Sequence, residues 1–313
     1  PKPPNTYRIL MLGDSFTFGF GVEAEQTFSK ILETSLNLKY PQKHFEVIND
    51  GLASGFTWDE AYLYTKEKGL KFQPDLIIEN VFLGNDIVDF EGHYYEQTDS
   101  LNLPQKIKST KTYVSAEGLR SKPAASAKNP KIFAAGIFNK LICDPLASCR
   151  LIRPLVEKNI AILVAKINPQ QSLPYFQFLE ENLSLEVEGY WQTAQKMILG
   201  LSQIAQENDI QLMVANIPIK EQVWDENNIL ESKKLNSLRL QEFLTKSQIA
   251  YCETGEKLKE KTNLTYFKYD SHLTPTGHQL AAAAIENCII ANISQYIITR
   301  PEVILLANDS PWY

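Results

Sequence analysis

Short apolar runs alternate with amphipathic segments along much of this chain, and that alternation is the strongest constraint on its fold. Tyr7–Gly13 (YRILMLG) and Asp75–Leu83 (DLIIENVFL) are almost continuously apolar, which is typical of strands buried on both faces. Between them, Thr27–Leu38 has apolar residues at helical spacing. The alternation predicts a three-layer α/β/α sandwich with a mainly parallel sheet.

The same pattern continues in the remaining predicted elements. Thr57 and Glu60 form a capping-box signal at the start of one of the predicted helices. The further strands are Phe45–Asn49, Ile210–Ile217 and Ile249–Cys252, and the further helices are Thr57–Lys68, Leu185–Glu207, about Leu230–Thr245 and Thr276–Ile293.

A long insertion interrupts the alternation at residues 93–183, so that residues 1–92 and 184–313 form the predicted core. From about His93 to Pro130 the chain is polar and is predicted to be a loop, whereas Ile132–Ile167 has helical periodicity with a break at Pro154. The insertion leaves the carboxyl edge of the sheet. It is therefore a candidate lid, a basic surface that rests on a membrane, or an extra layer packed on the core.

The charge and the cysteines of the sequence indicate which kinds of partner and which cellular compartment to expect. The 313 residues carry a net charge of −6, which argues against a nucleic-acid partner. No apolar run reaches the ~18 residues of a membrane span. The sequence begins at Pro1 without Met, so we expect that a signal peptide, a membrane anchor or only an arbitrary stretch of chain preceded it. Together with the short spacing of Cys143 and Cys149, this start leads us to expect an extracytoplasmic location with possible membrane proximity. We expect Cys143 and Cys149 to form a small disulfide, and Cys252 and Cys288 to be free core thiols.

The first chemical motif is Gly13-Asp14-Ser15 at the end of the first predicted strand. Side chains at the carboxyl edge of a parallel sheet face the crevice where ligands bind. One interpretation is that Asp14 or Ser15 only caps a helix. Phosphate-loop and dinucleotide-binding motifs are excluded, because Gly19 is followed by Phe20-Gly21 and the glycine spacing does not fit.

Two more strand ends carry small or amide residues. Gly51 and Gly55 lie in the segment after the second strand, and Gly84-Asn85-Asp86 follows the third. Each alone is an ordinary turn sequence. Together they could supply backbone N–H groups and a side-chain amide to one oxyanion.

The last motif is Asp270-Ser271-His272, just before the final helix. Residues two apart in an extended segment project to the same side, so Asp270 could fix the tautomer of His272. The other histidines are weaker candidates. His44 opens a strand, His93 begins a polar segment, and His278 lies inside the last helix as a packed or half-exposed ring.

These four segments, in this order, resemble the blocks of the SGNH (GDSL-type) serine hydrolases. The resemblance rests on Gly13-Asp14-Ser15, Gly55 with Thr57, Gly84-Asn85-Asp86 and Asp270 with His272, and covers about residues 7–90 and 185–295. It implies a flavodoxin-like fold, no metal and no cofactor. It also implies a catalytic triad of Ser15, Asp270 and His272 and an oxyanion hole of the Ser15 and Gly55 N–H groups and the Asn85 side chain.

The implied activity is that of a serine esterase, a carboxylic ester hydrolase that forms an acyl-enzyme. The resemblance includes lipases, esterases and carbohydrate O-deacetylases, with a small-molecule or polysaccharide ester as substrate. Two alternatives use the same crevice: an O-acetyltransferase acting on a cell-surface polysaccharide, and a catalytically silent binding module. A metallophosphoesterase would need the polar residues of these motifs around a cation, and only one well-placed histidine is present.

Overall fold

A five-stranded parallel sheet forms the centre of the computed structural model, which describes residues 1–53, 56–90, 93–109, 112–115, 118–121, 178, 182–224 and 235–299. The strand order is β2-β1-β3-β8-β9 and every neighbouring pair is parallel. This is the flavodoxin-like order, so the predicted fold class is confirmed. The strands are β1 (Thr6–Gly13), β2 (His44–Gly51), β3 (Leu76–Phe82), β8 (Gln211–Ile217) and β9 (Ala250–Glu253).

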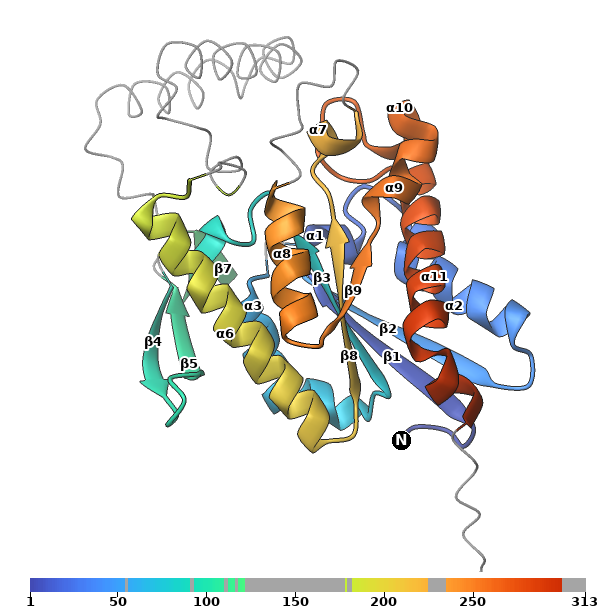
Figure 1. Cartoon of the computed structure of the whole chain (residues 1–313), viewed down its shortest axis with the longest axis horizontal. Helices are drawn as coiled ribbons and strands as arrows, with labels where there is room; N and C mark the ends of the chain where they lie inside the picture. Colours follow the sequence, from blue (N-terminus) through green and yellow to red (C-terminus); the bar gives the residue numbers. More distant parts are fainter. Residues whose placement is uncertain are drawn as a thin grey trace, which may run out of the picture.

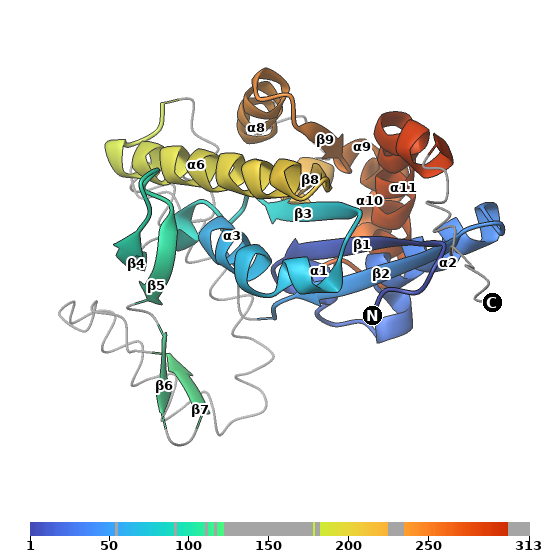
Figure 2. The same ribbon diagram turned by 90° about the horizontal axis from the view of Figure 1, so that it is seen from below.

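Helices cover both faces of this sheet and complete the three layers (Figure 1 and Figure 2). One face packs against α2 (Phe28–Lys39) and α11 (Pro275–Thr299), whose apolar side chains share one core cluster with those of β1 and β3. The other face packs against α3 (Trp58–Glu67), α6 (Leu185–Glu207) and α8 (Leu235–Lys246). Burial on both faces is the reason that β1 and β3 are apolar almost throughout.

Most element boundaries fall within one or two residues of the predictions. The helix predicted at 185–207 has those bounds in the structure. The capping box at the start of α3 is also present, with the N–H of Thr57 donating to Glu60 Oε2 over 3.1 Å. Residues 230–234 of the predicted helix before β9 lie outside the described residues.

The prediction that the chain from 93 to 130 is a loop is wrong where the structure describes it. Two antiparallel hairpins lie there, β4 (His93–Thr98) with β5 (Pro104–Ser109), and β6 (Thr112–Ser115) with β7 (Gly118–Ser121). The turn between β4 and β5 is held by Asp99, whose Oδ1 accepts two backbone N–H bonds of 2.9 Å. The predicted helical region at 132–167 and the Cys143–Cys149 pair lie outside the described residues, so the lid remains a prediction.

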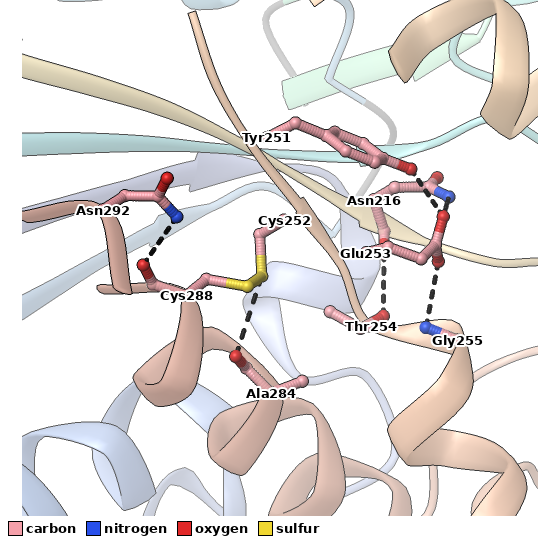
Figure 3. The surroundings of a disulfide bond; sticks show 9 residues. All are labelled: Asn216, Tyr251, Cys252, Glu253, Thr254, Gly255, Ala284, Cys288 and Asn292. Carbon is pink, nitrogen blue, oxygen red and sulfur yellow. Dashed lines mark hydrogen bonds between the residues drawn. A yellow bond between two sulfur atoms is a disulfide. The ribbon is translucent and has the colours of Figure 1, made fainter. Parts of the chain in front are cut away.

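Cys252 and Cys288 form a disulfide, which corrects the expectation of two free thiols (Figure 3). Cys252 lies on β9 and Cys288 on α11, with their Cα atoms 5.7 Å apart. The two cysteines are 36 positions apart in the sequence and meet only once α11 packs beside β9, so their spacing did not indicate the pair.

Short helical elements connect the strands to the longer helices. None of the helices in the described ranges is long and apolar enough to cross a membrane. The short elements are α1 (Ser15–Phe18), η1 (Ala24–Gln26), η2 (Gly69–Phe72), η3 (Val88–Phe90), α7 (Lys220–Val223), α9 (Gly255–Leu258), η8 (Lys259–Lys261) and α10 (Thr262–Thr265).

Candidate active site

The tight turn after β1 places Ser15 at the first position of α1, beside the point where the strand order reverses. Gly13 has a φ of +149°, and a Cβ there would lie 2.7 Å from the carbonyl oxygen of Asn80. Only glycine fits this close approach. Asp14 caps α1 by accepting the N–H of Phe16 at 2.9 Å, so the helix-cap interpretation is right for Asp14.

His272 lies on a loop closed by a bridge between Tyr266 and Leu273. Within the loop, Oδ1 of Asp270 accepts the backbone N–H of His272 at 2.8 Å. This is an Asx turn, which folds the carboxylate back over the residue two positions later. The sequence prediction paired Asp270 with His272 through an extended segment; the structure pairs them through this turn instead.

The side chains of Ser15, His272 and Asp270 form a continuous hydrogen-bonded chain. Oγ of Ser15 lies 2.8 Å from Nε2 of His272, and Nδ1 of His272 lies 2.5 Å from Oδ1 of Asp270. A carboxylate oxygen only accepts, so in the neutral ring Nδ1 carries the proton and Nε2 accepts from the Ser15 hydroxyl. This is the geometry in which an imidazole can remove a serine proton.

Two aromatic rings flank the imidazole of His272. The Phe16 ring lies 4.9 Å from it and the Phe20 ring 4.8 Å, measured between centroids. Phe16 is buried, whereas the Phe20 side chain remains 47% exposed between Gly19 and Gly21. The two rings restrict the tilt of the imidazole, and Phe20 presents an apolar surface next to it.

Ser15, Asn85 and His272 line one cavity of about 450 Å³. Gly55, the third predicted oxyanion donor, lies outside the described residues. Gly51 is not a donor, because its N–H is bonded to Oδ1 of Asn49 at 3.1 Å. The other lining residues are Asp14, Phe16, Phe82, Gly84, Ile219, Lys220, Glu221, Tyr269, Asp270 and Ser271.

Three buried carboxyl groups, those of Asp14, Glu79 and Asp86, lie close enough to interact, and Asp14 also lines the cavity. Burial raises the pKa of Asp14 to about 6, although the N–H of Phe16 and the charge of His272 oppose the rise. Burial, and then the charge of Asp14, raise the pKa values of Glu79 and Asp86 well above the ordinary range. Neither oxygen of Glu79 has a hydrogen-bond partner in the described part of the chain, so this group is held as the neutral acid.

The remaining histidines have structural partners. His278 is 1% exposed, and its Nδ1 accepts the N–H of Phe28 at 3.1 Å. Burial, and then the charge of His272, lower the pKa of His278 to about 4. His93 contacts Asp59 over 3.0 Å. Among the described residues, no group of three or more His, Cys, Asp or Glu side chains could hold a metal ion.

The sequence analysis assigned no role to two residues near the site, Lys220 and Phe20. Lys220 donates to the carbonyl oxygens of Phe267 and Lys268 at 2.5 and 2.8 Å and thereby ties the end of β8 to the His272 loop. Nothing in its neighbourhood distinguishes it from a surface lysine. Phe20 does have a signal, a large apolar residue between two glycines.

Comparison with known proteins finds similar structures at very low sequence identity. No family model and no curated protein sequence matches the chain. TesA has a TM-score of 0.48 and 9% identity, covering 90% of this chain and 98% of TesA. The acetyl xylan esterase AlAXEase has a TM-score of 0.49 and 12% identity over 90% and 100% of the two chains. Axe2, an acetylxylan esterase from Geobacillus stearothermophilus, has a TM-score of 0.48 and 11% identity, covering 90% of this chain and 94% of Axe2. Likeness at this level assigns neither a family nor an activity.

Proposed function

We propose that this protein is a GDSL-type serine esterase that cleaves carboxylic esters through an acyl-enzyme on Ser15. The observation that carries the proposal is the hydrogen-bonded chain from Ser15 through His272 to Asp270, with distances of 2.8 and 2.5 Å. A binding module without catalysis would not need an unprotonated imidazole nitrogen facing a serine hydroxyl.

The acylation step follows from these contacts. Oγ of Ser15 attacks the ester carbonyl carbon while Nε2 of His272 takes the hydroxyl proton. The resulting imidazolium is stabilised by the carboxylate of Asp270. The negative charge moves to the former carbonyl oxygen, for which the N–H of Ser15 and the side-chain amide of Asn85 are the candidate donors, with Gly55 as a further one.

Collapse of this intermediate breaks the bond to the alcohol. His272 returns its proton to the leaving alcohol oxygen, and the acyl group stays on Ser15. A water molecule then gives one proton to His272 while its oxygen attacks the acyl carbon. The bond from that carbon to Oγ of Ser15 breaks, His272 passes the proton to Oγ, and the acid leaves with the Ser15 hydroxyl restored.

We further propose that the protein works outside the cytoplasm, on a small-molecule or polysaccharide ester. The disulfide between Cys252 and Cys288 supports this location, because such bonds persist in oxidising compartments. The half-exposed Phe20 lies beside the His272 ring and offers an apolar contact to such a substrate.

A pair of histidine variants tests the proposal with a matched control. His272→Gln should reduce the turnover of a nitrophenyl ester by about 10³-fold or more, because it removes the base. His278 lies on α11, just after the His272 loop, and its ring accepts the N–H of Phe28. The turnover of His278→Gln should therefore stay within about threefold of that of the unchanged protein. Equal losses in both variants would contradict the assignment of His272 as the base.

A further inference from the structure

The side-chain amide of Asn85 has a carboxylate partner that the proposed mechanism does not use. Nδ2 of Asn85 donates to Oδ2 of Asp89 at 2.6 Å, and the backbone N–H of Asp89 donates to the carbonyl oxygen of Asn85 at 2.8 Å. The two residues therefore share one turn of the chain just after β3, and their side chains are joined by a charge-assisted bond.

This partner determines which end of the Asn85 amide faces Asp89. A carboxylate only accepts hydrogen bonds, so the NH₂ group turns toward it and the carbonyl oxygen of the amide turns away. The NH₂ group has two N–H bonds that diverge by about 120°. With one of them bound to Asp89, the second remains for an acceptor in the cavity that Asn85 lines together with Ser15.

The neighbouring carboxylate, Asp86, has a different role. Its Oδ2 accepts the N–H of Phe82 at 2.8 Å and lies 3.5 Å from Nε1 of Trp58, so it is directed into the core. Asp89 is therefore the carboxylate that contacts the Asn85 amide within the described part of this turn.

We propose that Asp89 is a positioning residue, which holds the Asn85 amide with one N–H available to the oxyanion beside Ser15. The proposal rests on the esterase function proposed above and extends it to the group that orients the oxyanion donor. A carboxylate near a developing negative charge also repels it, so Asp89 is useful there only if orienting Asn85 outweighs that repulsion. The two effects change kcat in opposite directions. An Asn85→Ala background separates them, because only the repulsion remains when there is no amide to orient.

A double-mutant cycle measures the orienting effect. Removing one oxyanion donor typically costs about 10²–10³ in kcat, so Asp89→Ala should lower kcat by about tenfold or more with little change in KM. Asp89→Asn keeps an acceptor oxygen and should recover kcat to within about threefold. In an Asn85→Ala background, Asp89→Ala should cause no further loss, because the two residues act as one unit.

A matched control removes an equivalent bond away from the cavity. Nε2 of Gln203 donates to Oε1 of Glu207 at 2.8 Å, an exposed amide–carboxylate pair with the same four-residue spacing. Glu207→Ala should leave kcat and KM unchanged. A rise in kcat in Asp89→Ala, or an equal loss in both backgrounds, would overturn the positioning role.

The side-chain amide resonance of Asn85 tests the contact independently of catalysis. Asp89→Ala should shift the Asn85 NH₂ protons, whereas Glu207→Ala should leave them in place. If Ser15→Ala retained esterase activity while Asp89→Ala still moved this resonance, the proposed esterase would fail and the contact would stand. If Ser15→Ala were inactive and the resonance did not respond to Asp89→Ala, the Asp89 proposal would fail and the esterase would stand.

Discussion

Asp14 is predicted to make the folded protein less stable as pH rises through the weakly acidic range. The group is 3% exposed, and burial raises its pKa from 3.8 to about 6. The folded state therefore binds this proton more tightly than the unfolded state, and between about pH 4 and pH 6 it carries more protons. Stability is lost across that window as pH rises, and the loss is complete above pH ~6.

The size of this loss follows from the pKa difference. A shift from 3.8 to about 6, at about 1.4 kcal/mol per unit, amounts to about 3 kcal/mol at neutral and alkaline pH. Asp14→Asn removes the charge and keeps an oxygen that can accept the N–H of Phe16 and cap α1. The variant should therefore gain about 2–3 kcal/mol relative to the unchanged protein when compared at about pH 8 instead of about pH 4.

Urea unfolding followed by tryptophan fluorescence measures this difference. The free energies of unfolding of both proteins are compared at about pH 4 and about pH 8. Asp14 destabilises the folded state only slightly at the lower pH and fully at the higher pH. A difference between the proteins that did not change with pH would show that Asp14 does not destabilise the folded state in this way. So would a variant that became less stable than the unchanged protein as pH rose.

Three further predictions follow from the same structure. His278→Gln should change the pH dependence of stability in the opposite direction to Asp14→Asn. Because burial lowers the pKa of His278 to about 4, this residue makes the stability of the unchanged protein rise between about pH 4 and pH 6.5. The urea midpoint of the variant should lack that rise. The double variant Cys252→Ser with Cys288→Ser should lose about 2–4 kcal/mol of unfolding free energy, and thermal melts with and without reductant should show the loss. Lys220→Met should lower ester turnover while the melting temperature stays within a few degrees, because the His272 loop loses its two carbonyl contacts; an unchanged turnover would contradict this role.

The spacing of apolar residues predicted the core strands and helices, because the burial of a strand or of one helix face leaves a pattern within that element's own sequence. Burial on both faces makes β1 and β3 apolar almost throughout, and a helix such as α6 repeats its apolar residues every three or four positions. The order of the motifs also predicted that Ser15, Asn85 and His272 would meet. Strand ends of a parallel sheet share one edge, which explains why Ser15 and Asn85 line the same cavity. His272 reaches that cavity from the loop between Tyr266 and Leu273.

Other features depend on contacts that sequence spacing does not encode. The disulfide needs α11 beside β9, and the Asx turn of Asp270 needs a loop closed by distant pairing. The β4–β5 hairpin did leave a signal, a tyrosine-rich strand followed by an Asp-Ser turn, but its polar composition favoured a loop interpretation. The Asn85–Asp89 bond could have been suspected from its four-residue spacing.

Covalent labelling tests whether Ser15 is the nucleophile. The protein is treated with a fluorophosphonate, and the adduct is mapped by mass spectrometry of the peptides. We expect one adduct, on Ser15, with none on the Ser15→Ala variant and strongly slowed labelling of His272→Gln. An adduct on another residue, or equal labelling of the unchanged protein and Ser15→Ala, would contradict this assignment of the nucleophile.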